Sequence, residues 1–404
     1  MNVIESVRDL ARLVSRGIDD SAVDITTIAA LLSIVNYEFP ERRLKNGLSI
    51  LLLGESTESL KSTVIEIVKE SITMDDAFSE ASSKKFVDGL VHDKSAVLLK
   101  DEISDEFTQW INGSRGKEGF FQLMCVCITG KSIEKMKYKS WSIDRLSDYK
   151  FSAIMATTYE GLETMQKSDE MLLGGFAFRL LYVPVKNCVD WKASGLRWTI
   201  EALEMLKNIK TFIDLVKRSR LSFTISISDS MRNEIDVFFN DAKDGRRDAV
   251  KKHIMRLVDV FYEIAIASAI DRYLATHEIR SGVVPLNLEN ADTTIASFFV
   301  VSSLLTFQTK FDDLSSEKML AKARKKLREN HGFMSERAFY HALGISKKQA
   351  DDIIILLVST GEVEMHDSTI VFSEYEEPVF VREENNEVDD VDEPEVDDVD
   401  EPAA

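Results

Sequence analysis

The sequence is poor in the residues that mark several classes of protein. Three cysteines in 404 residues exclude a disulfide-stapled scaffold and fit a reducing compartment such as the cytoplasm. Six prolines and 17 glycines are too few for a fibrous or repeat-rich protein. No apolar run reaches about 18 residues, and residues 1–16 mix charged with apolar side chains, so we expect neither a membrane span nor a signal peptide. A hydrophobic content of 44% instead predicts a folded chain with a large core.

The negative charge of the chain is concentrated at one end. Residues 374–404 hold 15 acidic residues and one basic residue, and contribute −14 of the formal net charge of −19. The rest of the chain is nearly neutral at −5, so its overall acidity does not exclude nucleic-acid binding. The acidic repeat of residues 388–394 recurs at 396–402. Such a sequence predicts a disordered tail, which either keeps the protein soluble or engages a basic protein partner.

Changes in apolar spacing divide the rest of the chain into four segments. Residues 1–46 predict an N-terminal helical segment, and residues 47–190 an α/β core. Residues 191–314 read as mostly helical, and residues 315–373 as a smaller unit. Because buried strands separated by helices form parallel sheets that bind ligands at the strand carboxyl ends, we expect such a sheet in the core. Its predicted strands are the short apolar runs at residues 48–53, 96–99, 151–156 and 180–183.

The segment from Gly54 to Thr63, GESTESLKST, lies between the first predicted strand and a helix. A phosphate-binding loop has this context, with a lysine that reaches the β- and γ-phosphates and a hydroxyl that binds Mg²⁺. Lys61 and Ser62 have the required side chains. The glycine pattern differs, because Gly54 stands one place early and Leu60 replaces the second glycine. A polar strand–helix loop therefore stays open as an alternative.

Three further elements follow the loop in chain order. The second predicted strand ends in Asp101 and Glu102, of which the first would hold Mg²⁺ and the second would polarise an attacking water. The third strand ends in Thr157 and Thr158, either of which can orient that water. Arg179 comes just before the fourth strand and can act as an arginine finger on a neighbouring subunit. We expect Lys61 and the two acids to converge on one nucleotide pocket.

The series GESTESLKST, VLLKDE, FSAIMATT and GGFAFRLLYV resembles the AAA+ ATPase core of replicative helicases, over roughly residues 45–310. It is most similar to the MCM-like and primase-associated ATPases of plasmids and viruses. The resemblance implies an ATPase with ATP and Mg²⁺ as cofactors, a P-loop parallel sheet with a helical lid, and a homo-oligomeric ring, namely a hexamer. It also implies a nucleotide-binding set of Gly54, Ser59, Lys61, Ser62, Thr63 and Arg256, with Glu102, Thr157 and Arg179 in catalysis and Ser62 and Asp101 at the metal.

A basic stretch lies between the acids and the third strand. Lys135, Lys137 and Lys139 alternate with Met136 and Tyr138, and Lys131 precedes them. Alternation of this kind predicts a β-hairpin with one basic face. In MCM-like helicases a hairpin in this region grips the DNA backbone, and neutralisation of phosphates would be insensitive to base sequence. A solvated hairpin without a ligand is the simpler interpretation.

The unit at residues 315–373 reads as helix, helix, turn, helix and hairpin, which is the winged-helix pattern. Its third helix would present Lys347, Lys348 and Gln349 to the major groove of DNA, although a winged helix can also bind protein. The leading hypothesis is thus an ATP-driven DNA helicase or translocase that acts on single- or double-stranded DNA in the replication of a plasmid or virus. The alternative is a degenerate ATPase that binds DNA as an initiator or regulator.

Overall fold

The structure is a computed structural model. It describes residues 1–44, 47–55, 59–72, 77–78, 83–113, 119–137, 141–168, 171, 175–187, 197–244, 246, 248–312, 322–343, 350–351, 353–354, 357–358, 362–366 and 368–372. The chain divides into two compact units, Met1–Ser315 and Ser316–Ala404, and each has a hydrophobic core of its own. The predicted acidic tail at residues 374–404 lies outside the described residues.

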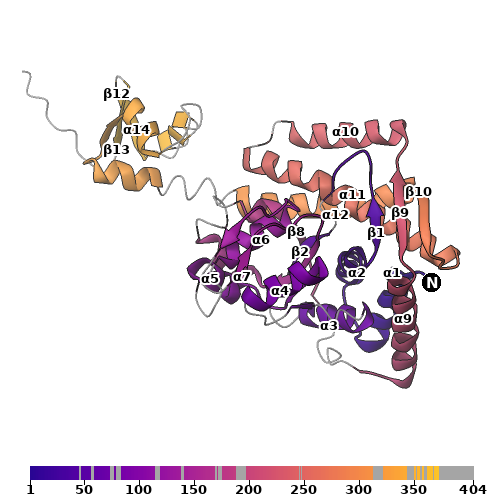
Figure 1. Ribbon diagram of the computed structural model, residues 1–404. Coiled ribbons are helices and arrows are strands. Elements are labelled where there is room, and N and C mark those ends of the chain that lie inside the picture. The colour runs from indigo at the N-terminus through magenta and orange to yellow at the C-terminus, as the bar shows by residue number, and fades with distance from the viewer. Residues whose placement is uncertain are drawn as a thin grey trace, which may run out of the picture. The chain divides into compact units, whose positions relative to one another are not determined.

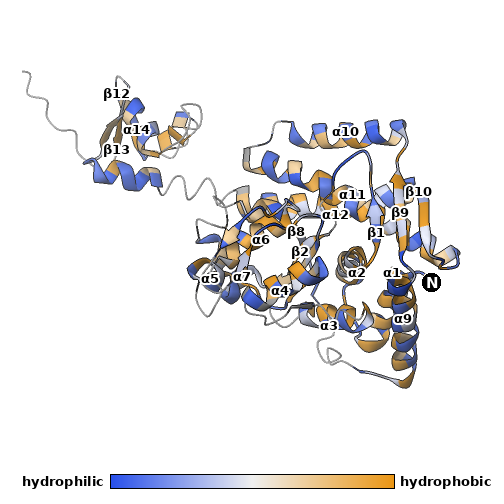
Figure 2. Ribbon diagram, viewed as in Figure 1, coloured by the Kyte–Doolittle hydropathy of each residue, from blue (hydrophilic) through white to orange (hydrophobic). Residues whose placement is uncertain are grey.

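The first unit begins with two helices that the sequence pattern predicts. In α1 (Val3–Val14) the Asn2 side chain caps the helix by accepting the Glu5 amide, and the apolar stripe is buried. In α2 (Asp20–Ile34) the Asp19 side chain caps the first turn, and most side chains are buried. Helix α2 is accordingly apolar around most of its circumference, whereas the surface helix α10 (Asp229–Lys243) is largely hydrophilic (Figure 2).

The main sheet of this unit is parallel throughout, which confirms the predicted α/β class. Each of the predicted strands forms, because each is a buried apolar run with a polar residue at its end. A further strand of two residues lies at one edge, and it is too short to leave a sequence signal. In the order β3-β4-β7-β2-β8, the strands are β3 (Ala77–Phe78), β4 (Ser95–Lys100), β7 (Lys150–Thr157), β2 (Ser49–Leu53) and β8 (Leu181–Pro184).

The strand crossovers of the main sheet change direction near its middle. After β2 the chain runs through α3 (Lys61–Ile72) toward the β3 edge, whereas after β7 it runs through α7 (Tyr159–Gln166) to the β8 edge. Right-handed crossovers in opposite directions put their helices on opposite faces, and ligands of open parallel sheets commonly bind at the strand carboxyl ends where this reversal occurs. The remaining helices of this region are α4 (Ser83–Asp93), α5 (Ser104–Asn112) and α6 (Phe120–Ile128).

Residues 191–314 are mostly helical, as predicted, and they also contribute two strands to a second parallel sheet that the sequence pattern did not predict. Its order is β1-β9-β10, from β1 (Asn36–Glu38), β9 (Leu221–Ser226) and β10 (Gly282–Asn287). The central strand alternates buried and half-buried residues, a period-two signal that the long flanking helices concealed. Its partners come from far away in the sequence. The helices around it are α9 (Ile200–Arg218), α10, α11 (Asp248–Thr276) and α12 (Asn290–Phe307), drawn in Figure 1.

Helix α12 continues into a π-helical turn, η3 (Gln308–Asp312). It packs along β8 and α11, with Phe299, Ser303 and Phe307 on the buried side. Among the described residues, Asn290–Phe311 is the one helical stretch long and apolar enough to cross a membrane by length and composition. Those two properties alone are weak evidence, since core helices share them.

The second unit contains a small antiparallel sheet of order β11-β13-β12. The predicted hairpin forms from β12 (Val363–His366) and β13 (Thr369–Phe372), and β11 (Phe333–Ser335) adds a strand that the sequence pattern did not predict. Helix α14 (Glu336–Leu343) follows β11, and residues 322–329 are also helical. Phe339, Leu343 and Ile370 are buried in the core of this unit.

Candidate nucleotide site

The loop after β2 is shaped by two unusual positions. A methyl group on Gly54 would lie 2.6 Å from the Ser59 Cβ, so only glycine fits there. Leu60 has a φ of 51°, in the left-handed region that favours glycine. The backbone therefore adopts a glycine-type conformation at the place where a phosphate loop has its second glycine. The β-carbon of Leu60 makes this conformation cost roughly 1–2 kcal/mol. Residues 56–58 lie outside the described part of the loop.

Lys61 is the first residue of α3 and is only 5% exposed. Its ammonium donates to the Gly54 carbonyl at 2.8 Å, to the Glu55 carbonyl at 2.7 Å and to the Ser59 hydroxyl at 2.8 Å. Burial lowers the pKa of Lys61, and the carboxylates of Glu102 and Glu55 act in the opposite direction. A phosphate held in this loop would replace some of these carbonyl acceptors and would face the N-terminus of α3.

Glu102 lies close enough for its charge to act on Lys61, although the two come from different strand ends. Its Oε1 accepts the Thr157 hydroxyl at 2.7 Å and the Ser104 hydroxyl at 2.8 Å. The Ile103 amide donates to the Ala156 carbonyl at 3.0 Å, and this bond ties the acidic turn to β7. The structure thus brings together Lys61, Glu102 and Thr157, which the sequence places in three separate motifs.

The remaining residues predicted for this pocket also lie at the carboxyl edge of the sheet. Asp101 directly follows β4 and is exposed, and Ser62 is exposed in the first turn of α3. Thr63 is half-buried in the same turn, and Thr158 caps α7 by accepting the Gly161 amide at 2.9 Å. Of the two threonines proposed to orient water, only Thr157 therefore contacts Glu102.

Arg179 lies near the amino ends of the strands, which we call the amino edge of the sheet, opposite to the carboxyl ends where Lys61 and Glu102 lie. It ends the short 3-10 turn η1 (Ala177–Arg179), which precedes β8. Because Ile50 pairs with Leu181 in parallel register, the run of β2 up to Gly54 separates Arg179 from the loop that follows β2 in the same chain by roughly 13 Å. A methyl group on Gly175 would lie 3.0 Å from the Arg179 Nη1, so this glycine makes room for the guanidinium.

Arg256 lies with Arg179 and not with Lys61. It is exposed on α11, which packs against η1. Burial lowers the pKa of Arg179, and the positive charge of Arg256 lowers it further. The two arginines form a pair at the amino edge of the sheet, so Arg256 does not join the cluster of Lys61, Glu102 and Thr157 in its own chain.

The basic stretch of residues 131–146 is an antiparallel hairpin. Strand β5 (Met136–Lys137) pairs with β6 (Ser142–Ile143), and the Ile133 and Leu146 backbones bond to each other at its base. Met136 packs toward the core, while Lys131, Lys135 and Lys137 are exposed. The predicted basic face therefore forms within the described residues. Lys139 lies outside them, as do Lys347, Lys348 and Gln349 of the second unit.

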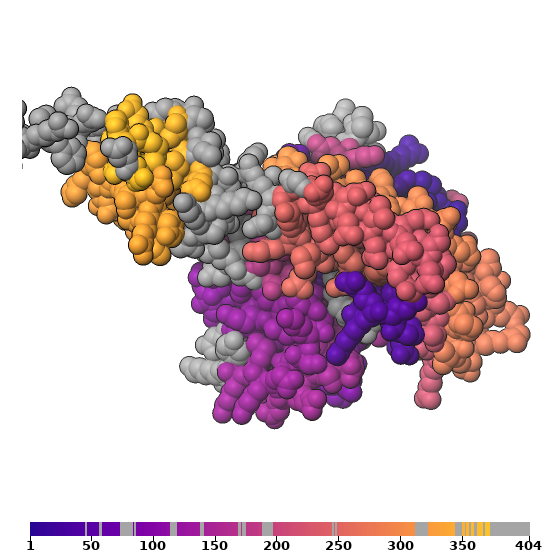
Figure 3. Space-filling view, turned by 90° about the horizontal axis from the view of Figure 1, so that it is seen from above, coloured from indigo at the N-terminus to yellow at the C-terminus, as the bar shows by residue number. Residues whose placement is uncertain are grey.

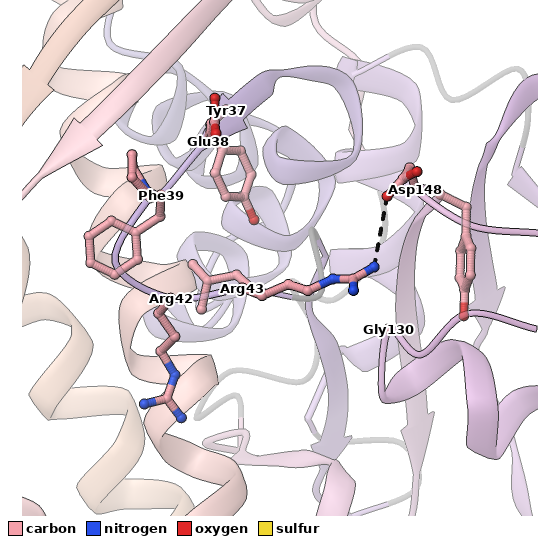
Figure 4. A pocket seen from close by; sticks show the side chains of 10 residues that line it. Tyr37, Glu38, Phe39, Arg42, Arg43, Gly130 and Asp148 are labelled. Carbon is pink, nitrogen blue, oxygen red and sulfur yellow. Dashed lines mark ion pairs between the residues drawn. The ribbon is translucent and has the colours of Figure 1, made fainter.

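One cleft of the described residues lies away from the loop that follows β2. It has a volume of about 360 Å³ and lies between residues 37–44, which precede β2, and the turn at Gly130. Arg43 extends toward Asp148, at 3.8 Å, whereas Arg42 runs in another direction (Figure 4) and pairs with Asp259 at 2.6 Å. An indigo segment of the N-terminal region lies between the salmon helices and the purple region in the space-filling view (Figure 3). The cleft thus opens at the amino edge of the sheet.

Several residues of the carboxyl edge were missed by the sequence analysis. A methyl group on Gly161 would lie 2.2 Å from the Thr157 Oγ1 and 3.2 Å from the Glu102 Oε1, so this glycine makes room for the pair. A glycine in the first turns of a helix that follows a polar strand end was the available signal. Ser104 donates to Glu102 from a position that reads as an ordinary first-turn serine.

At the amino edge, His253 is a single histidine within a helical stretch, and the sequence around it gives no sign of a site. Its side chain is fully buried, and burial lowers the pKa of the imidazole to about 3. Among the described residues, no three histidine, cysteine or acidic side chains are grouped as ligands for a metal ion.

Comparison with known proteins does not extend these observations. No protein-family model matches the chain, and a search of curated proteins finds no match to its sequence.

Proposed function

We propose that this chain is an AAA+-type ATPase that acts on DNA as a ring-forming motor. The observation that carries the proposal is the convergence of Lys61, Glu102 and Thr157 at the carboxyl ends of three adjacent strands of one parallel sheet. The strand with the acids is separated from the strand with the phosphate loop by β7. The polar strand end of β7, with Thr157, therefore lies between the acids and the loop that holds Lys61.

The carboxyl edge has the groups that ATP hydrolysis requires. Lys61 would bind the β- and γ-phosphates, and the backbone of the loop with the start of α3 would hold them. Ser62 and Asp101 offer the hydroxyl and carboxylate oxygens that Mg²⁺ prefers. Bound there, the ion would neutralise charge on the phosphates. Glu102 would polarise the attacking water, and its hydrogen bond with Thr157 would fix the carboxylate.

The amino edge would complete the site of a neighbouring subunit. Arg179 is too far along the strands to reach the phosphates of its own loop. An arginine finger supplied by another molecule stabilises the transition-state charge, and Arg256 beside Arg179 would add a second cation. In this arrangement each subunit gives Lys61 and Glu102 to one nucleotide and the two arginines to the next, which favours a closed ring.

DNA would bind to the exposed lysines of the hairpin. Lys135 and Lys137 point to solvent while Met136 anchors the strand, so they can neutralise phosphates without reading bases. Lys131 and the 77% exposed side chain of Arg43 border the neighbouring cleft and would extend this basic surface. The hairpin β12-β13 and helix α14 of the second unit are compatible with the predicted winged helix, which would give a second DNA contact.

The loop itself favours one other candidate, a nucleotide-binding regulator that hydrolyses ATP slowly or not at all. Leu60 holds a strained backbone conformation, and the ammonium of Lys61 is already bound by two loop carbonyls. The carboxylate of Glu55 would also repel phosphates. All three features weaken phosphate binding relative to a glycine-rich loop.

ATP hydrolysis by the purified protein, with and without single-stranded DNA, separates these candidates. We expect Mg²⁺-dependent hydrolysis that DNA stimulates and that the Lys61→Ala variant lacks. Binding of ATP without turnover would favour the regulator, and absence of nucleotide binding would overturn both. The DNA affinity should fall steeply with salt, because phosphate contacts release counterions.

A further inference from the structure

The turn that carries Arg179 is attached to helices from a distant part of the chain. His253 of α11 stacks on Phe307 of α12, with ring centroids 4.2 Å apart and planes 16° apart. Its Nδ1 lies 3.3 Å from the Phe178 carbonyl, in the residue directly before Arg179. Its Nε2 lies 3.5 Å from the Ser303 hydroxyl. The imidazole therefore connects η1 with both helices.

The chemistry of these partners defines how the protons are arranged. A carbonyl oxygen only accepts, so the hydrogen bond with Phe178 requires a proton on Nδ1. In a neutral ring Nε2 then accepts, and the Ser303 hydroxyl can donate to it. The Ser303 oxygen in turn accepts the Tyr182 amide at 2.8 Å, and the Tyr182 hydroxyl donates to the Ala177 carbonyl at 2.9 Å. The chain of bonds thus connects Ala177 and Phe178, the first two residues of η1, with α11, α12 and β8.

We infer that His253 is a positioning residue for Arg179, which fixes the 3-10 turn so that the guanidinium projects toward a neighbouring subunit. The inference rests on the proposed function, in which Arg179 acts on the nucleotide of that neighbour. A core histidine without this role would need only to satisfy its two nitrogens. Here both nitrogens are bonded to groups that flank Arg179 within a few residues, namely the Phe178 carbonyl and, through Ser303, the Tyr182 amide.

Phenylalanine at this position separates positioning from packing. His253→Phe keeps an aromatic ring on Phe307 but removes both hydrogen bonds. We expect kcat for ATP hydrolysis to fall on the order of 10²-fold, as for other small displacements of a catalytic group, with KM and ATP affinity unchanged. His253→Asn retains an N–H donor near the Phe178 carbonyl and should recover most of the lost kcat.

Ser152→Ala is the matched control for lost buried polarity. Ser152 is fully buried on β7, where its hydroxyl donates to the Ala29 carbonyl at 3.0 Å and accepts the Leu48 amide at 3.2 Å. Neither of these hydrogen bonds involves η1. We expect this variant to lose thermal stability while kcat stays at the wild-type level. If Ser152→Ala lowers kcat as much as His253→Phe does, the inference is overturned, because stability alone would explain both.

The decisive readout is a double-mutant cycle with Arg179→Ala. If His253 acts through Arg179, adding His253→Phe to Arg179→Ala lowers kcat no further. Additive losses would overturn the inference. Should His253→Phe fail to fold, Ser303→Ala breaks the same chain of bonds and enters the cycle in its place. If the wild-type protein hydrolyses ATP and His253→Phe is fully active, only this inference is overturned. If the wild-type protein does not hydrolyse ATP, the proposed function is overturned, and this inference with it.

Discussion

The two edges of the main sheet are held in different ways. At the carboxyl edge, Lys61, Glu102 and Thr157 are fixed by bonds within their own loops and between adjacent strand ends. At the amino edge, the turn of Arg179 is held by His253 and Ser303, which come from helices far along the chain. Because the parallel strands keep the two edges apart by roughly 13 Å, a nucleotide bound as we propose could contact groups of both edges only across a subunit boundary.

Substitution of Arg179 tests this division most strongly. We expect Arg179→Ala to lower kcat for ATP hydrolysis by at least about 10³-fold, the usual effect of an arginine finger, with ATP affinity unchanged. Steady-state hydrolysis and nucleotide titration measure the two quantities. Arg218→Ala, on the exposed end of α9, is a control for loss of a surface cation. Loss of ATP binding in Arg179→Ala would place this residue in its own pocket and break the comparison.

The buried imidazole of His253, at the amino edge, predicts that the free energy of unfolding depends on pH. Burial lowers the pKa of His253 to about 3 in the folded protein. As the pH falls below about 6.5, the ordinary pKa of histidine, the unfolded chain therefore binds the proton first. The stabilising contribution is complete above that value and is lost progressively toward pH 3. Between pH 6.5 and 5, wild-type unfolding free energy should therefore fall about 2 kcal/mol more than that of His253→Phe in denaturant titrations. Parallel pH profiles for the two proteins would contradict it.

Thr157→Val tests the pairing at the carboxyl edge. The isosteric change removes the 2.7 Å hydrogen bond to Glu102, and we expect kcat to fall about tenfold with little change in ATP affinity. Thr158→Val is the neighbouring control, because Thr158 caps α7. It should cost about 1 kcal/mol of stability without an effect on kcat. The reverse pattern in the kinetics would assign the orienting role to Thr158.

The smallest expected effect is on ATP affinity, when the charge of Glu55 in the loop after β2 is removed. Glu55→Gln removes a carboxylate beside Lys61, and repulsion from a charge at about 4 Å in water is worth about 1 kcal/mol. ATP affinity should therefore rise about fivefold at low salt, and less at high salt. Glu66→Gln, an exposed acid of α3, controls for net charge. Equal effects of the two changes would show that Glu55 has no local role.

The sequence predicted the carboxyl edge better than the amino edge for a physical reason. Buried strands are short apolar runs, and the polar residues that end neighbouring parallel strands must share one edge. Lys61 and Glu102 could therefore be expected to lie together. The conformation of Leu60 could not be predicted, because a leucine gives no sign of a left-handed backbone.

Contacts between distant segments account for most of what was missed. The sheet β1-β9-β10 joins strands from three separate regions, each with little signal of its own. Likewise, nothing near Arg179 in the sequence indicates His253 or Ser303, which reach η1 only after α11 and α12 pack beside β8. The proximity of Arg256 to Arg179 arises in the same way, since α11 packs against η1.

Mixing two inactive variants tests the central claim most directly. Lys61→Ala subunits would lack a functional phosphate loop but keep Arg179, whereas Arg179→Ala subunits would keep the loop and lack the arginine. If the two edges meet on one nucleotide across subunits, the mixture hydrolyses ATP at a measurable fraction of the wild-type rate although each variant alone does not. A mixture as inactive as its components, in assemblies shown to contain both variants, would contradict the account.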